Sequence, residues 1–155
     1  DRDLVQRNLK DMKVFAYECT SAAYTITGFG SYFQANMALM DPKVRAQLFL
    51  PDRPVYTKVR DDMPAKYGLG SLVSNSIVAD GCVIDGEVEN CVLFRGVKVK
   101  KGARLKNCVI MQDCVIGEGT KLDYVVADKN VEFDMNRTMS GYQSYPVYVA
   151  KGSRV

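Results

Sequence analysis

The chain contains 155 residues, of which 47% are hydrophobic, and its formal net charge is +3 with acidic and basic residues interspersed. This composition predicts a soluble globular protein and excludes the concentrated basic surface that nucleic-acid binding requires. A membrane span needs about 20 consecutive apolar residues, and no apolar run of the chain approaches that length. Residues 1–10 are polar and do not resemble a signal peptide. We therefore expect a cytoplasmic protein without nucleic-acid or membrane partners.

The amino-terminal part of the chain predicts a helical linker. Residues 13–19 predict a short strand with no obvious partner strand in this chain. Apolar and aromatic residues within 30–50 recur with the spacing of one amphipathic helix, which is interrupted near Pro42 and then resumes for a turn or two. Residues 52–70 mix acids, bases and prolines, and predict an extended connector with one strand at 55–59.

One sequence block recurs roughly every 15 to 17 residues between Val73 and Ala127. Its copies begin at Val73, Val88, Leu105 and Leu122, and they read VSNSIV, VENCVL, LKNCVI and LDYVVA. Shorter units of turn residues followed by an apolar residue lie between the blocks, so apolar residues return about every six positions. This spacing suits neither an α-helix nor a meander of longer alternating strands.

A period of about six residues predicts a coil with three short strands per turn. One β-branched or Leu side chain of each strand points into the shaft, and Gly, Asp or Asn turns each corner. Stacked coils form parallel sheets, and each coil buries the apolar side of its neighbour. We therefore predict a mainly β fold, a parallel β-helix of hexapeptide repeats preceded by the helical linker.

Equivalent positions of successive coils are expected to stack. We expect one interior column, formed by Val92, Val109 and Val126. Asn90 should lie above Asn107 at a corner, and Cys91 and Cys108 also occupy equivalent positions. Because the five cysteines of the chain form no CxxC pair, we interpret these two as small buried side chains rather than as a redox or metal pair.

The region after the repeats predicts a loop and one more coil. Residues 134–145 are polar and interrupt the hexapeptide spacing, whereas residues 146–155 return to it and would help to cover the open sheet edges. A basic stretch on one part of the coils is a weak candidate for anion contacts, because outward alternation alone would also produce it. It consists of Lys98, Lys100, Lys101, Arg104 and Lys106.

The chain contains no histidine. Histidine is the commonest general base and the commonest metal ligand, so its absence removes most nucleophile and metal arrangements. We assign no catalytic residue and no metal site to this chain.

Several segments resemble bacterial glucose-1-phosphate adenylyltransferases, and in particular their GlgD-type glycogen biosynthesis subunit. The connector RPVYTKVRDDMPAKYG at residues 53–68 carries the resemblance, together with the repeat segments NSIVADGCVI at 75–84 and VLFRGVKV at 92–99. The similarity extends from VFAYE at 14–18 to YPVYVAKG at 145–152, which is nearly the whole chain.

The resemblance implies a larger parent protein. Its N-terminal nucleotidyltransferase domain joins ATP to glucose 1-phosphate, and its C-terminal left-handed β-helix serves assembly and regulation. Residues 1–52 would then be the end of the nucleotidyltransferase domain and the linker helix, and residues 53–155 the left-handed β-helix domain. Mg²⁺ and ATP are implied only for the catalytic parent domain, so we expect no cofactor in this chain.

One departure from the family bears on catalysis. Catalytic members carry a Tyr-Trp-x-Asp-Val-Gly-Thr segment shortly before the helix that contains Ser31, and its aspartate helps to hold the metal and the phosphates. In this chain the aspartate position holds Thr25 and the glycine position holds Thr27. A neutral hydroxyl cannot replace a carboxylate that neutralises a divalent cation, so the resemblance implies a subunit with weak or no catalysis of its own.

The resemblance also implies two candidate regulatory residues. Asp128-Lys129-Asn130 matches a motif in related pyrophosphorylases whose lysine contacts an anionic sugar-phosphate or phosphoglycerate activator. Lys129 is therefore an allosteric anion-binding candidate, and Lys151 is a second one. The alternative for Lys129 is a solvated lysine at a corner of the coil.

The expected function is an assembly and regulatory module that associates with a catalytic pyrophosphorylase subunit, with copies of itself, or with both. A hexapeptide acyltransferase is an alternative, although the usual catalytic base of that class is a histidine and this chain has none. The same absence excludes β-helical carbonic anhydrases. A purely structural interaction module, using the linker helix and the exposed side of the coils, is the third interpretation.

Overall fold

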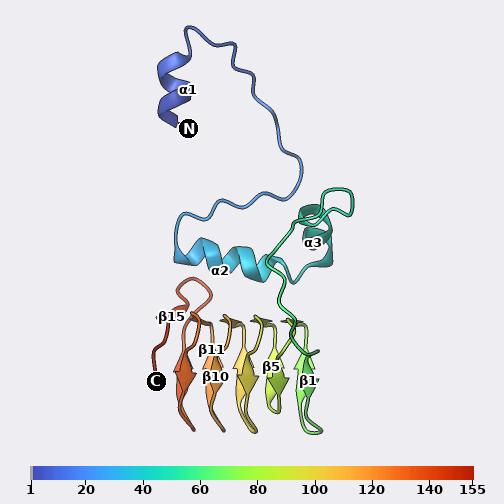
Figure 1. Ribbon diagram of the computed structural model, residues 1–155. Helices are drawn as coiled ribbons and strands as arrows, with labels where there is room; N and C mark the ends of the chain where they lie inside the picture. The colour runs from blue at the N-terminus through green and yellow to red at the C-terminus, as the bar shows by residue number, and fades with distance from the viewer. Residues whose placement is uncertain (1) are drawn as a thin grey trace.

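A computed structural model describes residues 2–155, and short parallel strands form a three-sided β-helix from Lys66 onward (Figure 1). Sheet A has the order β1 (Lys66–Tyr67), β4 (Val83–Ile84), β7 (Lys98–Val99), β10 (Val115–Ile116), β13 (Glu132–Phe133). Sheet B has the order β2 (Leu72–Ser74), β5 (Glu87–Glu89), β8 (Arg104–Lys106), β11 (Lys121–Asp123), β14 (Thr138–Ser140). Sheet C has the order β3 (Ile77–Val78), β6 (Val92–Leu93), β9 (Val109–Ile110), β12 (Val125–Ala127), β15 (Val147–Val149). The predicted parallel β-helix is confirmed.

The corner between sheets B and C shows why the coils stay in register. Asn75, Asn90 and Asn107 each adopt a positive φ there, a conformation that Asn tolerates better than most residues. The Nδ2 of Asn75 donates to Asn90, that of Asn90 to Asn107, and that of Asn107 to Asp123, with the first and last of these bonds at 3.0 Å. The predicted stacking of Asn90 and Asn107 is therefore confirmed, and it ties four coils together.

The predicted interior column of valines is wrong. Val92, Val109 and Val126 are buried, but they point out of the coil and pack with Phe33 of a helix. The inward positions on sheet C belong to their neighbours, which join the interior formed with the other two sheets: Cys91, Leu93, Cys108, Ile110, Val125, Ala127. Successive strand residues face opposite sides, and both faces of this sheet are covered. Hydrophobicity alone therefore does not distinguish inward from outward positions here.

Three helices precede the coils: α1 (Arg2–Asn8), α2 (Phe29–Ala38) and α3 (Pro42–Leu48). The hydroxyl of Ser31 accepts the backbone N–H of Gly28 at the start of α2. Asp41 caps α3 by accepting the N–H of Lys43, with Pro42 in the first turn, where proline is favoured. The predicted helix with an interruption near Pro42 is therefore confirmed.

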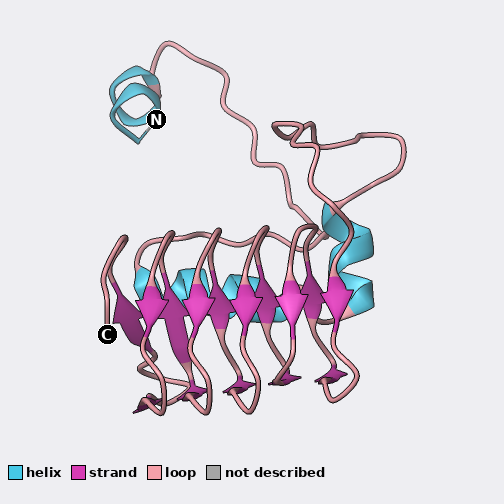
Figure 2. Ribbon diagram, turned by 60° about the horizontal axis from the view of Figure 1, so that its bottom comes forward, coloured by secondary structure: helices cyan, strands magenta, loops and turns pink. Residues whose placement is uncertain are grey.

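Helix α2 lies along the outer face of sheet C, parallel to the axis of the coils (Figure 2). Its Phe33 side chain is only 2% exposed and lies on the outward valines of β6, β9 and β12. At its amino end the ring of Phe29 meets Tyr148 of β15 edge to face, with centroids 5.3 Å apart. The helix therefore spans several coils and holds them against one another.

Two predicted strands are absent from the structure. Residues 13–19 and 55–59 have no strand partner and run as irregular chain, and α1 lies apart from the coils (Figure 1). A strand needs a neighbour to satisfy its backbone hydrogen bonds, and neither segment has one within residues 2–155. An apolar pattern in a segment that has no neighbouring strand is therefore not enough to predict a strand.

The last coil is longer than predicted. Within the predicted loop at 134–145 the chain forms β14, which pairs with β11, so the actual loop is confined to residues 141–146. The predicted final coil is confirmed, because β15 pairs with β12 and Arg154 forms a bridge with Glu132.

The division into residues 1–52 and 53–155 stays a prediction. In the structure the coils begin at Lys66, and α2, from the first of these regions, packs on them. None of the helices within residues 2–155 combines the length and apolar character that crossing a bilayer requires.

We predict that Phe33→Ala lowers the free energy of unfolding by about 3 kcal/mol, because it removes the aromatic ring that α2 buries against sheet C. Gln34→Ala, on the exposed side of the same helix, should change it by less than about 0.5 kcal/mol. Urea denaturation followed by circular dichroism measures both changes. Equal effects of the two substitutions would show that α2 is not stably docked.

A basic corner as candidate anion-binding site

The corner between sheets C and A carries one residue of each coil in a column: Asp80, Arg95, Gln112, Lys129, Lys151. Backbone hydrogen bonds between neighbouring coils fix this order. For example, Gly96, which follows Arg95, donates its N–H to the carbonyl of Asp80 in the preceding coil. The last of these bonds joins Gly152 to Lys129 at 2.9 Å. The structure thus places the two predicted anion-binding residues, Lys129 and Lys151, on adjacent coils, about 4.8 Å apart along the stack.

The connector before the coils adds two more cations to this corner. Nη1 of Arg95 donates to the carbonyl of Lys58 at 3.1 Å, and the N–H of Gly81 donates to the carbonyl of Met63. These bonds hold the connector along the corner, so that Lys58 and Arg60 lie beside Lys129. We call the set Lys58, Arg60, Arg95, Lys129 and Lys151 the basic corner.

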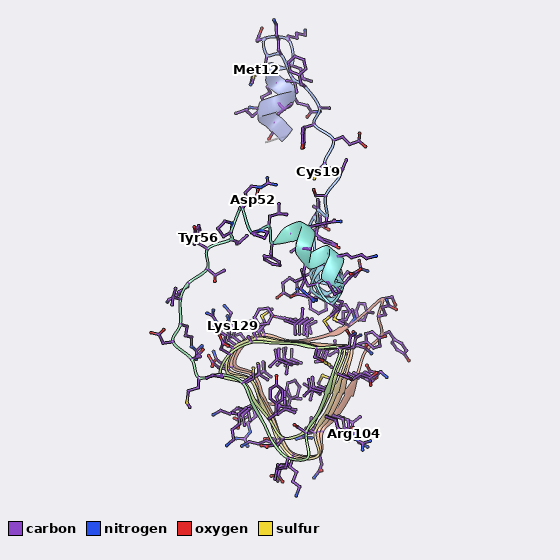
Figure 3. All side chains as sticks on the ribbon, turned by 90° about the vertical axis from the view of Figure 1, so that its right-hand side faces the viewer. Met12, Cys19, Asp52, Tyr56, Arg104 and Lys129 are labelled. Carbon is purple, nitrogen blue, oxygen red and sulfur yellow. The ribbon has the colours of Figure 1, made fainter. Side chains whose placement is uncertain are left out.

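A surface groove of about 430 Å³ lies between the connector and the corner. It is lined by Lys58, Val59, Arg60, Arg95, Gln112, Asp113, Lys129, Asn130. Viewed along the axis in Figure 3, Lys129 projects from the corner nearest to this connector. The groove has four cationic lining residues and one carboxylate, so it can attract a small anion.

The cations of the basic corner differ in their partners. The guanidinium of Arg60 contacts Asp113 at 3.3 Å and Asp62 at 2.9 Å. The hydrogen bond and the charge of Asp113 raise the pKa of Arg60, and the guanidinium is protonated in any case. Within residues 2–155, no carboxylate lies within 4.0 Å of a side-chain nitrogen of the other four cations. These four therefore supply charge that no carboxylate in the described part of the chain neutralises at close range.

Sequence reasoning missed Lys58, Arg60 and Arg95. The connector lies 37 residues before Arg95 in sequence, and only its path back along the coils brings them together. The basic composition of residues 52–70 was the one available signal, and it did not indicate which corner the connector would follow.

The basic stretch between Lys98 and Lys106 does not form a site. Its members are spread over β7, the next corner and β8, and two of them pair with carboxylates of the preceding coil. Arg104 lies 3.1 Å from Glu87, and Lys106 lies 3.2 Å from Glu89. Arg104 lies on strand β8 of sheet B, away from Lys129, in Figure 3. This stretch is explained by outward alternation.

Four of the five cysteines line the shaft: Cys82, Cys91, Cys108 and Cys114. Burial raises the pKa of Cys82 and Cys108, and it raises that of Cys114 to about 11. The backbone N–H of Cys108 donates to the sulfur of Cys91 at 3.3 Å. The interpretation of Cys91 and Cys108 as buried packing residues is confirmed, and such thiols are poor nucleophiles.

Thr25, at the position where the resemblance implies a metal-holding aspartate, does not fit a divalent cation. Thr25 is exposed in an irregular segment, and the backbone N–H of Thr27 donates to Ser31. Within residues 2–155 no three side chains of Asp, Glu, His or Cys converge to hold a metal ion. A threonine hydroxyl supplies neither the charge nor the second oxygen of a carboxylate.

Comparison with known proteins extends these observations. A family model described as "GlmU-like, C-terminal hexapeptide" matches residues 63–143. The chain is 42% identical over 151 residues to "Glycogen biosynthesis protein GlgD" of Bacillus subtilis (strain 168), which covers 97% of this chain and 44% of that protein. It is 56% identical over 69 residues to the protein of the same name from Geobacillus stearothermophilus, which covers 44% of this chain and 20% of that protein.

The chain is also similar to a protein whose name describes an enzyme activity. The chain is 32% identical over 147 residues to "Glucose-1-phosphate adenylyltransferase" of Acetivibrio thermocellus, which covers 94% of this chain and 34% of that protein. The chain thus spans less than half the length of the curated relatives it matches. It corresponds to their C-terminal part.

We predict that a maleimide reagent at about pH 8 modifies Cys19 rapidly and modifies the other four cysteines only after unfolding. Cys19 is exposed, whereas burial removes the others from the reagent and disfavours their thiolate forms. Peptide mass spectrometry after short exposure measures the modification at each site. Rapid labelling of Cys114 in the folded chain would contradict a closed shaft, and Cys19→Ser provides the matched background.

Proposed function

The chain belongs to the glucose-1-phosphate adenylyltransferase family that includes GlgD, and we propose that it is the assembly and regulatory β-helix of a GlgD-type subunit. The parent enzyme makes ADP-glucose and pyrophosphate from ATP and glucose 1-phosphate for glycogen biosynthesis, and it acts in the cytoplasm. The observation that carries the proposal is the 42% identity to GlgD over 97% of the chain.

The proposed division of labour assigns chemistry to a different subunit. Mg²⁺ and ATP are bound by the catalytic subunit, where a carboxylate can balance the charge of the metal. The subunit that contains this chain has Thr25 at the corresponding position. It therefore contributes by binding the catalytic subunit and changing its response to effectors.

The first coil supports a role in assembly. Strands β1, β2 and β3 each lie at the end of a sheet, so one side of each strand lacks a strand partner within residues 2–155. Unprotected strand edges favour pairing with another chain. Four apolar side chains are exposed at this end, namely Tyr67, Leu69, Leu72 and Val73, and Leu72 is 67% exposed. This end of the β-helix is the proposed contact surface for a partner subunit.

The basic corner supports a role in regulation. Its cations come from both the connector and the coils, so one bound anion would bridge these two parts. A metabolite with a phosphate group is the effector class that this cluster would bind, because Arg and Lys favour phosphate oxygens. Lys129 and Lys151 are its proposed contacts on the coils.

The assembly proposal is tested by mixing the full-length protein that contains this chain with a catalytic glucose-1-phosphate adenylyltransferase subunit and measuring ADP-glucose formation. We expect a changed rate or a changed effector response, together with co-elution in size-exclusion chromatography. Leu72→Asp should abolish co-elution by placing a charge in the apolar contact. Thr138→Asp, in the same outward column at the opposite end of sheet B, is the matched control. Unchanged activity and separate elution of the two proteins would refute this role.

The regulatory proposal is tested with inorganic phosphate and the present chain. We expect Lys129→Ala to weaken phosphate binding about fivefold, since an exposed charge contact contributes up to about 1 kcal/mol. Lys121→Ala removes the same charge from the outer face of sheet B and should have little effect. Titration followed by NMR chemical shifts of the corner residues measures both. Equal weakening by the two substitutions would contradict a specific contact at Lys129.

A further inference from the structure

We propose that Asp113 is an internal competitor for the basic corner, whose carboxylate occupies Arg60 until a multiply charged anion displaces it. The residue would thereby determine which anions the corner accepts. This inference rests on the proposed function in one respect, because it assumes that the basic corner binds an anion.

The contact between Arg60 and Asp113 has the geometry of a bound anion. Nη1 of Arg60 donates to one carboxylate oxygen of Asp113 and Nη2 donates to the other, both at 3.3 Å. This two-bond arrangement is the one that guanidinium groups form with carboxylates and phosphates. Asp113 lines the same groove as Lys58, Arg95 and Lys129, and it is the only carboxylate among the lining residues. Its carboxylate therefore lies where an incoming anion would bind.

The backbone of the corner places this carboxylate. Asp113 has a φ of 58°, in a column whose other members also have positive φ: Gly81, Gly96, Asn130, Gly152. From this position its carboxylate lies over Gly96 of the preceding coil, in the space that a β-carbon at Gly96 would occupy. Gly96 thus leaves the room that Asp113 needs to reach Arg60.

Of the two carboxylates on Arg60, Asp113 is the exchangeable one. Asp62 holds the Nε side of the guanidinium at 2.9 Å, and its side chain is only 16% exposed. Asp113 makes the longer contact, and its side chain and that of Arg60 are each 44% exposed. Exposed ion pairs of this kind contribute little net stability, so an anion with stronger contacts can replace the carboxylate.

Competition of this kind selects for charge. A monovalent carboxylate that replaced Asp113 would regain a contact equivalent to the one that was lost, and it would still bear the entropic cost of association. A phosphate dianion has more charge and a third oxygen, which can reach the unpaired lysines of the groove. Displacing Asp113 costs the same free energy for either anion, so only an anion with contacts beyond Arg60 keeps a net affinity for the corner.

The test compares Asp113→Asn with Asp80→Asn in the full chain. Both substitutions remove one negative charge at the same corner, but Asp80 is not a groove residue and makes no ion pair within residues 2–155. Asn tolerates positive φ, so the fold at position 113 should be preserved. The probes are inorganic phosphate at about pH 8 and acetate, titrated at constant ionic strength and followed by NMR.

We expect Asp113→Asn to tighten phosphate binding and acetate binding by about fivefold each, whereas Asp80→Asn changes either by less than about twofold. Tighter binding only in Asp113→Asn supports the inference, even if wild-type binding is too weak to measure. Phosphate binding that is weakened by Lys129→Ala but unaffected by Asp113→Asn would overturn the inference and leave the anion site intact. No phosphate binding in any variant would overturn both.

Discussion

The in-register stacking of successive coils is the constraint on which the other features of this molecule depend. Backbone hydrogen bonds join equivalent residues of neighbouring coils, so each side chain lies above its counterpart at the spacing of a β-sheet. A residue type repeated at one position therefore becomes a column. The asparagine ladder, the pair of Cys91 and Cys108, and the corner column that carries Lys129 and Lys151 are three such columns with different chemistry. A shift of the register by one residue would turn all three toward the wrong side.

The register also shows where this β-helix departs from an ideal repeat. Asn90 and Asn107 are 17 residues apart, but Asn75 and Asn90 are only 15 apart, so one coil is shorter. The shortening lies at the corner between sheets A and B, where only residues 85–86 separate β4 from β5. A β-carbon on Gly86 would collide there with the carbonyl of Ala103. Tyr124 occupies the position of the asparagines one coil later, with a φ of 50° that is unfavourable for a bulky residue. Its ring packs 6.2 Å from that of Phe33, so the strained corner contributes to the docking of α2.

Much of the fold could be predicted because the repeat is a local pattern. Turn residues and apolar residues at six-residue intervals are enough to predict the coils, the corner asparagines and the last coil. The orientation of Val92, Val109 and Val126 could not be predicted this way, because it depends on where α2 packs, which is a long-range contact. The strands expected at residues 13–19 and 55–59 failed for a related reason, since a strand exists only where a partner accepts its hydrogen bonds.

The residues of the candidate site likewise fall into two groups, those predictable from a local pattern and those placed by long-range contacts. Lys129 was identified by its motif, and the register explains why Lys151 lies beside it. Lys58 and Arg60 depend on the path of the connector, which no local pattern indicates. Because Lys58 and Arg60 belong to the connector, an anion at the proposed site would contact the connector as well as the coils. An anion held only by the coils would be a surface contact, whereas an anion held by coils and connector together favours the conformation in which the connector follows the corner.

Thermodynamic linkage then relates anion binding to the rest of the chain. The connector, residues 49–65, joins α3 to β1, so it links the helical segment to the first coil. An anion that binds more tightly when the connector lies along the corner stabilises that conformation of the connector. By reciprocity, a contact that keeps the connector along the corner increases the affinity for the anion. Helix α2 is held separately, by Phe33 on the outward valines, so the helical segment contacts the coils independently of the connector. The charge balance at Arg60 is therefore the point at which the proposed anion site and the path of the connector meet.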